Sequence, residues 1–271
     1  MAPLSLIDQD ARYAGLLLKA IAVCRNYKPK FGAGGDGMTL AQFQTVYGAD
    51  AFYSWMGLDS PLMYAAHKAS GGMTSVYRQI GIGMQFVFTQ ILVDHLDLTA
   101  SDAVWSYTVE KIGSKKMRTL SLDGRIPLAS VKDSAKRKRV EDWMKKCATK
   151  LGVDSKIMAA LKGPVFEVRQ GYKSMDSKRQ NADIANAATA YMQGYLPVAL
   201  LVSNQIDGTL VVRYTLEKWV ILRGSLKGDS TESTFTFCKD VIGYDLVGFF
   251  ERNSAAFKAE IDITLKSLLS S

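Results

Sequence analysis

The sequence contains little histidine and little cysteine, and both shortages exclude whole classes of catalytic site. Only two histidines, His67 and His95, occur among 271 residues. Hydrolases that hold a metal on paired histidines, as in an H-E-x-x-H helix, therefore have no counterpart here. The three cysteines, Cys24, Cys147 and Cys238, are far apart and form no C-x-x-C pair. We expect reduced structural thiols, with neither a zinc knuckle nor a disulfide framework.

Long hydrophobic runs and nucleotide-binding motifs are also missing. The longest apolar runs, such as residues 198–202, fall far short of the roughly 20 residues that a membrane span needs. The first eight residues have no basic stretch and no long apolar core, so we expect no signal peptide, no membrane partner and a cytoplasmic location. The chain contains no G-x-S-x-G elbow and no Walker A loop. The glycine-rich segments 32–37 and 81–83 do not follow a buried strand, so they are not dinucleotide loops.

The composition is that of a globular protein. Hydrophobic residues make up 48% of the chain and charged residues 22%, which is compatible with one large domain. The first part is helical in pattern, with apolar residues at helical spacing. The expected helices cover residues 8–27, 39–47 and 76–96. We expect residues 1–100 to be a helical part that packs on an α/β core of residues 101–271.

Strand patterns begin after residue 100. Residues 105–110 and 117–122 alternate like two paired strands, and residues 133–151 form a basic amphipathic helix. A short strand at residues 164–171, a helix at 177–193 and a continuous apolar strand at 196–202 make one βαβ unit. Three further strands are expected, at residues 209–214, 219–222 and 233–238, before closing helices at 243–269. The fold class is therefore α/β, a mixed central β-sheet flanked by helices, with a helical N-terminal part.

Positive charge exceeds negative charge and is concentrated in a few segments. The net charge is +8, and residues 136–146 carry a large share of this excess. Clustered lysine and arginine favour attraction to a polyanion, with an affinity that depends on salt. The cations that open this segment, and that we expect to contact DNA, are Lys136, Arg137, Lys138 and Arg139.

The densest group of polar residues follows the expected strand at residues 164–171. Glu167 and Arg169 share one face of this strand, because side chains alternate, and Lys173 follows in the same direction. The first turn of the next helix adds backbone N–H groups that favour phosphate. Without histidine pairs, the remaining route to hydrolysis uses carboxylates that hold Mg²⁺ with a cation nearby. These features predict a phosphate-handling site. The polar side chains that open the next helix are Lys178, Arg179, Gln180 and Asn181.

The phrase Glu-Val-Arg-Gln-Gly-Tyr-Lys-Ser-Met-Asp-Ser-Lys-Arg-Gln-Asn, which begins at Glu167, resembles that of bacterial type II restriction endonucleases of the PD-(D/E)XK nuclease superfamily. The resemblance covers about residues 152–203. It implies a restriction-endonuclease-like core in which one strand carries the acid and the base of (D/E)-x-K. It also implies a Mg²⁺-dependent hydrolysis of double-stranded DNA, and it suggests a homodimer.

The residues that match this motif carry its roles by resemblance. Glu167 matches the metal-binding acid, and Arg169 occupies the usual position of lysine. Arginine stays protonated, so it cannot be a general base, although it can stabilise a charged transition state. Lys173 can supply the ammonium instead. The first acid remains open between Asp154, if residues 154–161 form a strand, and Asp123, if they form a helix.

The expected reaction is therefore cleavage of a phosphodiester with the catalytic set Glu167, Arg169 and Lys173 and with Mg²⁺ on Glu167 and one aspartate. Base reading is expected from arginine, lysine, asparagine or glutamine side chains that reach the major groove. Besides the basic helix, the candidates are Asn204 and Gln205, which follow the buried strand. Two alternatives use the same sequence: a DNA-binding protein without catalysis, and an enzyme that acts on an acidic small molecule.

Overall fold

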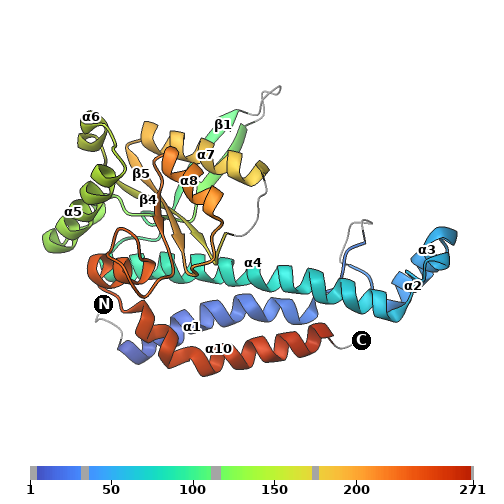
Figure 1. Cartoon of the computed structure of the whole chain (residues 1–271). Coiled ribbons are helices and arrows are strands. Elements are labelled where there is room, and N and C mark those ends of the chain that lie inside the picture. The colour runs from blue at the N-terminus through green and yellow to red at the C-terminus, as the bar shows by residue number, and fades with distance from the viewer. Residues whose placement is uncertain (1–4, 32–36, 111–116, 173–176, 270–271) are drawn as a thin grey trace. The chain divides into compact units, whose positions relative to one another are not determined.

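The computed structural model describes residues 5–31, 37–110, 117–172 and 177–269 (Figure 1). At residues 109, 110, 118 and 177–181 it describes the backbone and not the side chains. Contacts divide the chain into two units. Unit 1 comprises residues 1–83 and 252–271, and unit 2 comprises residues 84–251.

Unit 1 is helical. Its elements are α1 (Leu6–Ala22), η1 (Val23–Asn26), α2 (Leu40–Gly48), α3 (Ala51–Trp55), the first part of α4 (Pro61–Leu96) and the last part of α10 (Leu246–Leu269). Thr39 forms a capping box with Gln42 at the start of α2, as a helix start signal predicts. Arg252 donates two hydrogen bonds to Asp10, at 2.6 and 3.1 Å, which joins α10 to α1. The expected helical N-terminal part is therefore present, although α4 begins at Pro61 and not at residue 76.

Unit 2 contains both sheets. Its strands are β1 (Trp105–Glu110), β2 (Met117–Leu122), β3 (Gly124–Arg125), β4 (Gly163–Arg169), β5 (Tyr195–Leu201) and β6 (Val220–Leu222). Its helices besides α4 and α10 are η2 (Leu128–Ser130), α5 (Ser134–Lys150), α6 (Ser155–Ala159), α7 (Ser177–Met192), α8 (Gly208–Leu216), α9 (Thr234–Phe237) and η3 (Cys238–Ile242). β1 and β2 form an antiparallel pair, and the larger sheet has the order β3-β4-β5-β6. β3 is antiparallel to β4, whereas β4, β5 and β6 are parallel, so the α/β fold with a mixed sheet is confirmed.

The two faces of the larger sheet are covered by different helices. On one face Phe166 of β4 contacts Phe88 of α4 at 5.0 Å and Phe237 of α9 at 5.7 Å between ring centroids. The other face carries Val165, which clusters with Ala187 of α7 and with residues of α8. Figure 1 shows α5 and α6 on the opposite side of the strands from α7 and α8. Because side chains alternate along β4, Glu167 and Arg169 belong to the face that α7 covers.

Two expected strands are helices. Residues 209–214 lie in α8, and residues 233–238 lie in α9 and η3. The β-branched residues of α8 favour a strand by propensity. The cap overrides that preference, because Asp207 accepts a hydrogen bond from the Thr209 N–H at 2.8 Å. In the same way Ser233 accepts from the Thr236 N–H at 3.1 Å and starts α9.

The other elements of unit 2 lie close to their predicted ranges. β4, α7 and β5 form the predicted βαβ unit, and β6 is the strand expected at residues 219–222. Asp133 caps α5 by accepting from two backbone N–H groups at 2.8 and 2.9 Å. The turn between β1 and β2, at residues 111–116, lies outside the described residues. None of the helices in the described ranges combines the length and the apolar content that a membrane crossing requires.

Candidate active site on strand β4

Glu167 and Arg169 form an ion pair on the face of β4 that α7 covers. The Arg169 Nη2 lies 2.8 Å from the Glu167 Oε1, and the two side chains are only 13% and 7% exposed. The predicted placement of these two residues on one face of a strand is therefore confirmed. A charge pair this well buried requires additional hydrogen-bond partners, because removal of charges from water is costly.

Those partners come mainly from Asp183 of α7. The Arg169 Nη2 donates to both carboxylate oxygens of Asp183, at 3.1 and 3.0 Å. Tyr172 donates its hydroxyl hydrogen to the Asp183 Oδ2 at 3.1 Å, and Tyr214 of α8 donates to the same oxygen. The Arg169 guanidinium also lies over the Tyr172 ring, 4.6 Å from its centroid. We call these five residues the Arg169 network: Glu167, Arg169, Tyr172, Asp183 and Tyr214.

The shifted pKa values of three groups in this network match the protonation states that its hydrogen bonds require. Burial alone lowers the pKa of Arg169, but the charges of Glu167 and Asp183 outweigh burial and raise it. Burial and then the Asp183 charge raise the pKa of Tyr214, and burial raises the pKa of Tyr172. At neutral pH the guanidinium is therefore charged and both phenols are protonated donors.

Asp123 lies beside the same segment of β4. Its N–H donates to the Phe166 carbonyl at 2.8 Å, and its Oδ2 accepts from the Val168 N–H at 2.8 Å. Asp123 directly precedes β3, whose Gly124 pairs with Phe166 of β4. The carboxylate of Asp123 is therefore bound to the backbone of β4, one residue after Glu167.

The alternative acid, Asp154, lies in a different setting. Residues 155–159 form α6 and not a strand, and Asp154 is its exposed N-cap, which accepts from the Lys156 N–H at 2.8 Å. An N-cap carboxylate is occupied with the backbone of its own helix. Of the two aspartates that the sequence left open, the structure brings Asp123 and not Asp154 to β4.

The basic helix α5 makes many internal contacts. Lys136 pairs with Asp97 at 2.8 Å, and Lys138 pairs with Asp142 at 3.1 Å. Arg137 donates to the Val131 carbonyl, and Arg139 donates to the Val241 carbonyl, each at 3.3 Å. The buried side of the helix packs on unit 2 through Val140, Trp143, Met144, Cys147 and Ala148. The cations of α5 are therefore distributed along the outer side of a structural helix.

The remaining predicted residues are described only in part. Lys173 lies outside the described residues. Lys178, Arg179, Gln180 and Asn181 belong to the first turns of α7, whose side chains are not described there. Asn204 and Gln205 are exposed after β5, and the Gln205 carbonyl accepts from the Tyr172 N–H at 2.8 Å.

Two acidic residues lie at β4, Glu167 within the strand and Asp123 beside it. The described ranges contain no group of three or more histidine, cysteine, aspartate or glutamate side chains that could hold a metal ion. Mg²⁺ is commonly bound through one or two carboxylates and keeps several waters.

No local pattern in the sequence indicates Asp183, Tyr172 and Tyr214 as partners of Arg169. Asp183 and Tyr214 lie on separate helices, 31 residues apart, and meet only when α7 and α8 pack on the same face of the sheet. Comparison of the chain with protein-family models, with curated proteins and with solved structures found no match.

Proposed function

We propose that the protein is a Mg²⁺-dependent endonuclease that hydrolyses phosphodiester bonds of double-stranded DNA, of the type II restriction endonuclease kind. The observation that supports this proposal is the presence of two acidic residues at one part of the sheet: Glu167 in β4, and Asp123, which directly precedes β3 and accepts a hydrogen bond from the Val168 N–H. Two acids in this relation, with a cation two residues after the second, correspond to the PD-(D/E)XK motif that the sequence resembles. A restriction-endonuclease-like core is part of the same proposal.

In this proposal Asp123 and Glu167 hold Mg²⁺. A bound Mg²⁺ supplies neutralisation of the phosphate charge and acidification of water. The chain contributes the orientation of these acids. The backbone N–H of Val168 fixes Asp123 through the bond to its Oδ2, and Arg169 fixes Glu167.

Arg169 is therefore proposed as a positioning residue. Its guanidinium already contacts two carboxylates and the Tyr172 ring, so little of it is left for a phosphate. Lys173 follows β4 in the sequence and remains the candidate for the cation that stabilises the developing negative charge.

DNA contact is proposed for the exposed cations of α5 and for the polar residues that follow β4 and β5. The α5 ion pairs do not exclude this role, because exposed pairs contribute little free energy. Phosphate contacts of this kind make affinity fall as salt rises. The proposed set comprises Lys136, Arg137, Lys138, Arg139, Lys178, Arg179, Gln180, Asn181, Asn204 and Gln205.

The test is cleavage of supercoiled plasmid with Mg²⁺ and with EDTA, followed by sequencing of the fragment ends. We expect discrete fragments with Mg²⁺ only. Glu167→Gln and Asp123→Asn should each lower the cleavage rate by several orders of magnitude and retain binding in a gel-shift assay.

The matched control is Asp154→Asn, because asparagine also caps a helix and the substitution leaves α6 intact. It should cut like the unmodified protein. If Asp154→Asn abolishes cutting and Asp123→Asn does not, the site is wrongly assigned. If the protein shifts DNA and never cuts it, the chain is a DNA-binding protein without catalysis.

A further inference from the structure

Unit 2 contains a second polar region, a cavity of about 570 Å³ beside the edge strand β6. It is bounded by the end of α5, by α8, by β6 and by the loop after β6. Cavities of this size are typical of small-molecule sites. The wall is apolar on the β6 and α8 side, where Val211, Val220 and Ile221 lie, and polar on the loop side. The polar lining residues include Lys150, Asn204, Arg223, Lys227, Thr231 and Glu232.

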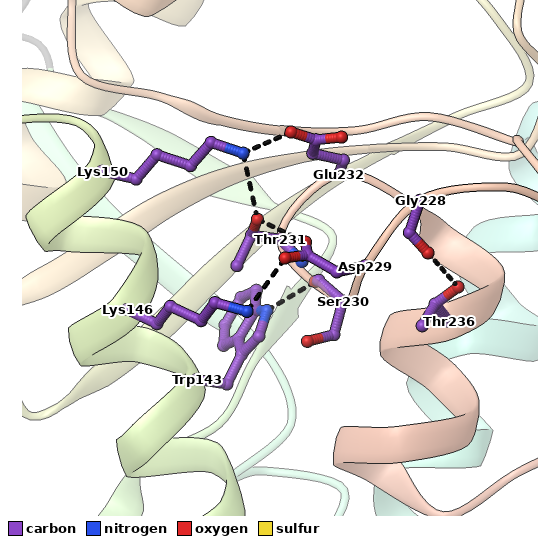
Figure 2. A network of polar contacts seen from close by, with 9 residues as sticks. All are labelled: Trp143, Lys146, Lys150, Gly228, Asp229, Ser230, Thr231, Glu232 and Thr236. Atoms are coloured by element: carbon purple, nitrogen blue, oxygen red, sulfur yellow. Dashed lines mark hydrogen bonds and ion pairs between the residues drawn. The ribbon is translucent and has the colours of Figure 1, made fainter.

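The polar wall is held in place by a dense hydrogen-bond network, shown in Figure 2. Asp229 accepts from the Thr231 N–H at 2.8 Å and from its hydroxyl at 2.6 Å, and it pairs with Lys146 of α5 at 2.9 Å. The Trp143 indole donates to the Ser230 carbonyl at 2.6 Å. Hydrogen bonds to Asp229 from Thr231 and Lys146 lower its pKa, so the carboxylate is charged at neutral pH. These contacts hold the polar wall in place, which reduces the entropy cost of binding.

The charges of the lining residues favour an anion. The lining includes three cations, Lys150, Arg223 and Lys227, and one carboxylate, Glu232. Lys150 pairs with Glu232 and also donates to the Thr231 hydroxyl at 3.3 Å (Figure 2). Within the described part of the chain, the side chains of Arg223 and Lys227 have no hydrogen-bond or ion-pair partner. Two cations therefore remain to bind a ligand. Their combined charge nearly balances the negative charge of a phosphate monoester at neutral pH.

The position of the cavity also favours a ligand with a phosphate group. Arg223 directly follows β6 and Asn204 follows β5, so both come from the carboxyl ends of parallel strands. Ligands of open α/β sheets bind at these ends. An arginine fork there matches the oxygens of a phosphate group in a bidentate manner.

The apolar side contains Trp219, which is buried and packs on Tyr214 with ring centroids 5.5 Å apart. Its indole Nε1–H has no partner among the described residues. A buried donor without a partner is uncommon and often marks a water or a ligand. Trp219 also makes this wall observable by fluorescence.

We propose that this cavity binds a nucleotide, with the phosphate on Arg223 and Lys227 and the nucleoside against the apolar wall of β6 and α8. The nucleotide is either free or the phosphorylated end of a DNA strand, since both carry the same phosphate ester. The proposal does not require that the protein cut DNA.

The experiment is titration of the whole protein in EDTA, followed by calorimetry and tryptophan fluorescence. The probes are a deoxynucleoside 5′-monophosphate, the matching nucleoside, and a short single strand with and without a 5′-phosphate. We expect the phosphorylated form of at least one pair to bind at least about tenfold more tightly than its unphosphorylated form. Arg223→Ala and Lys227→Ala should remove most of this difference, and Trp219→Phe should remove the fluorescence change.

The matched control is Lys239→Ala, an exposed cation outside the cavity, which should bind like the unmodified protein. Preference for the free monophosphate assigns the source to a free nucleotide, and preference for the phosphorylated strand assigns it to DNA. Equal binding of phosphorylated and unphosphorylated probes overturns the proposal. Binding that persists in both cavity variants also overturns it. The absence of binding at a millimolar concentration of every probe does the same. Because every measurement is made without Mg²⁺, failure here is distinct from failure of the nuclease proposal.

Discussion

The Arg169 Nη2 lies 2.8 Å from the Glu167 Oε1 and 3.0 Å from the Asp183 Oδ2, so one guanidinium joins a strand residue to a helix residue. Both carboxylates and the guanidinium are buried to about nine-tenths. The orientation of Glu167, and hence the proposed metal site, therefore depends on a residue of α7 that does not belong to the motif.

Arg169→Ala should destabilise unit 2 strongly. Removal of one partner from a buried ion pair leaves uncompensated charge and costs about 3–5 kcal/mol of unfolding free energy. Urea denaturation followed by circular dichroism measures this loss. The control is Lys138→Ala, which removes an exposed pair with Asp142 and should have no measurable effect. Equal stability of the two variants would show that Arg169 is not buried among these charges.

Tyr214→Phe should lower stability by about 1.5–3 kcal/mol, because a hydrogen bond to a charged carboxylate is lost in a buried site. Tyr53→Phe, at a half-exposed position of α3, should change it by less than about 0.5 kcal/mol. A double-mutant cycle with Asp183→Asn should show clear non-additivity. Simple additivity would argue against a direct contact between Tyr214 and Asp183.

Gly163→Ala should destabilise the start of β4. A Cβ at this position would lie 1.9 Å from the Ile126 carbonyl oxygen, and that backbone belongs to the segment that pairs β3 with β4. We expect a loss of about 1–3 kcal/mol, as for an overpacked core. Gly208→Ala is the matched control, since nothing lies within 4 Å of its added Cβ at the start of α8. It should be neutral or slightly stabilising, and thermal denaturation of both variants tests the contrast.

His95 should make stability depend on pH. Burial lowers its pKa, its Nε2 has no hydrogen-bond partner in the described part of the chain, and its ring packs on Tyr244 at 4.9 Å. The unfolded chain then binds a proton more readily than the folded chain, so stability is complete above about pH 6.5 and falls below it. His95→Phe should weaken this fall. Urea unfolding at about pH 7.5 and about pH 5.5 measures it, and an identical pH dependence in both proteins would contradict the prediction.

The sequence predicted those helices and strands whose patterns depend only on residues close together in the chain. The buried apolar run of β5, the amphipathic pattern of α5 and the alternation in β1 and β2 depend on neighbouring residues only. The prediction of a strand at α8 was wrong. The β-branched residues of this segment favour a strand, and the only local indication of a helix start was the capping residue Asp207. Local signals therefore located Glu167 and Arg169 and could not choose between Asp123 and Asp154.

The partners of Arg169 were not predictable in the same way. Asp183 is an ordinary polar residue of an amphipathic helix, and only the packing of α7 on β4 turns it toward Arg169. Tyr172 and Tyr214 reach the same carboxylate from a loop and from α8. A single sequence contains no spacing rule for contacts that three separate elements create.

The Arg169 network also has a consequence for synthesis of the chain. Asp123 emerges from the ribosome first, β4 follows about forty residues later, and Tyr214 comes later still. Until α7 and α8 have left the ribosome and packed on the sheet, Asp183 and Tyr214 cannot orient Arg169, or Glu167 through it. A nascent chain therefore presents no ordered acid pair, and the proposed cutting activity arises only after most of unit 2 has been translated.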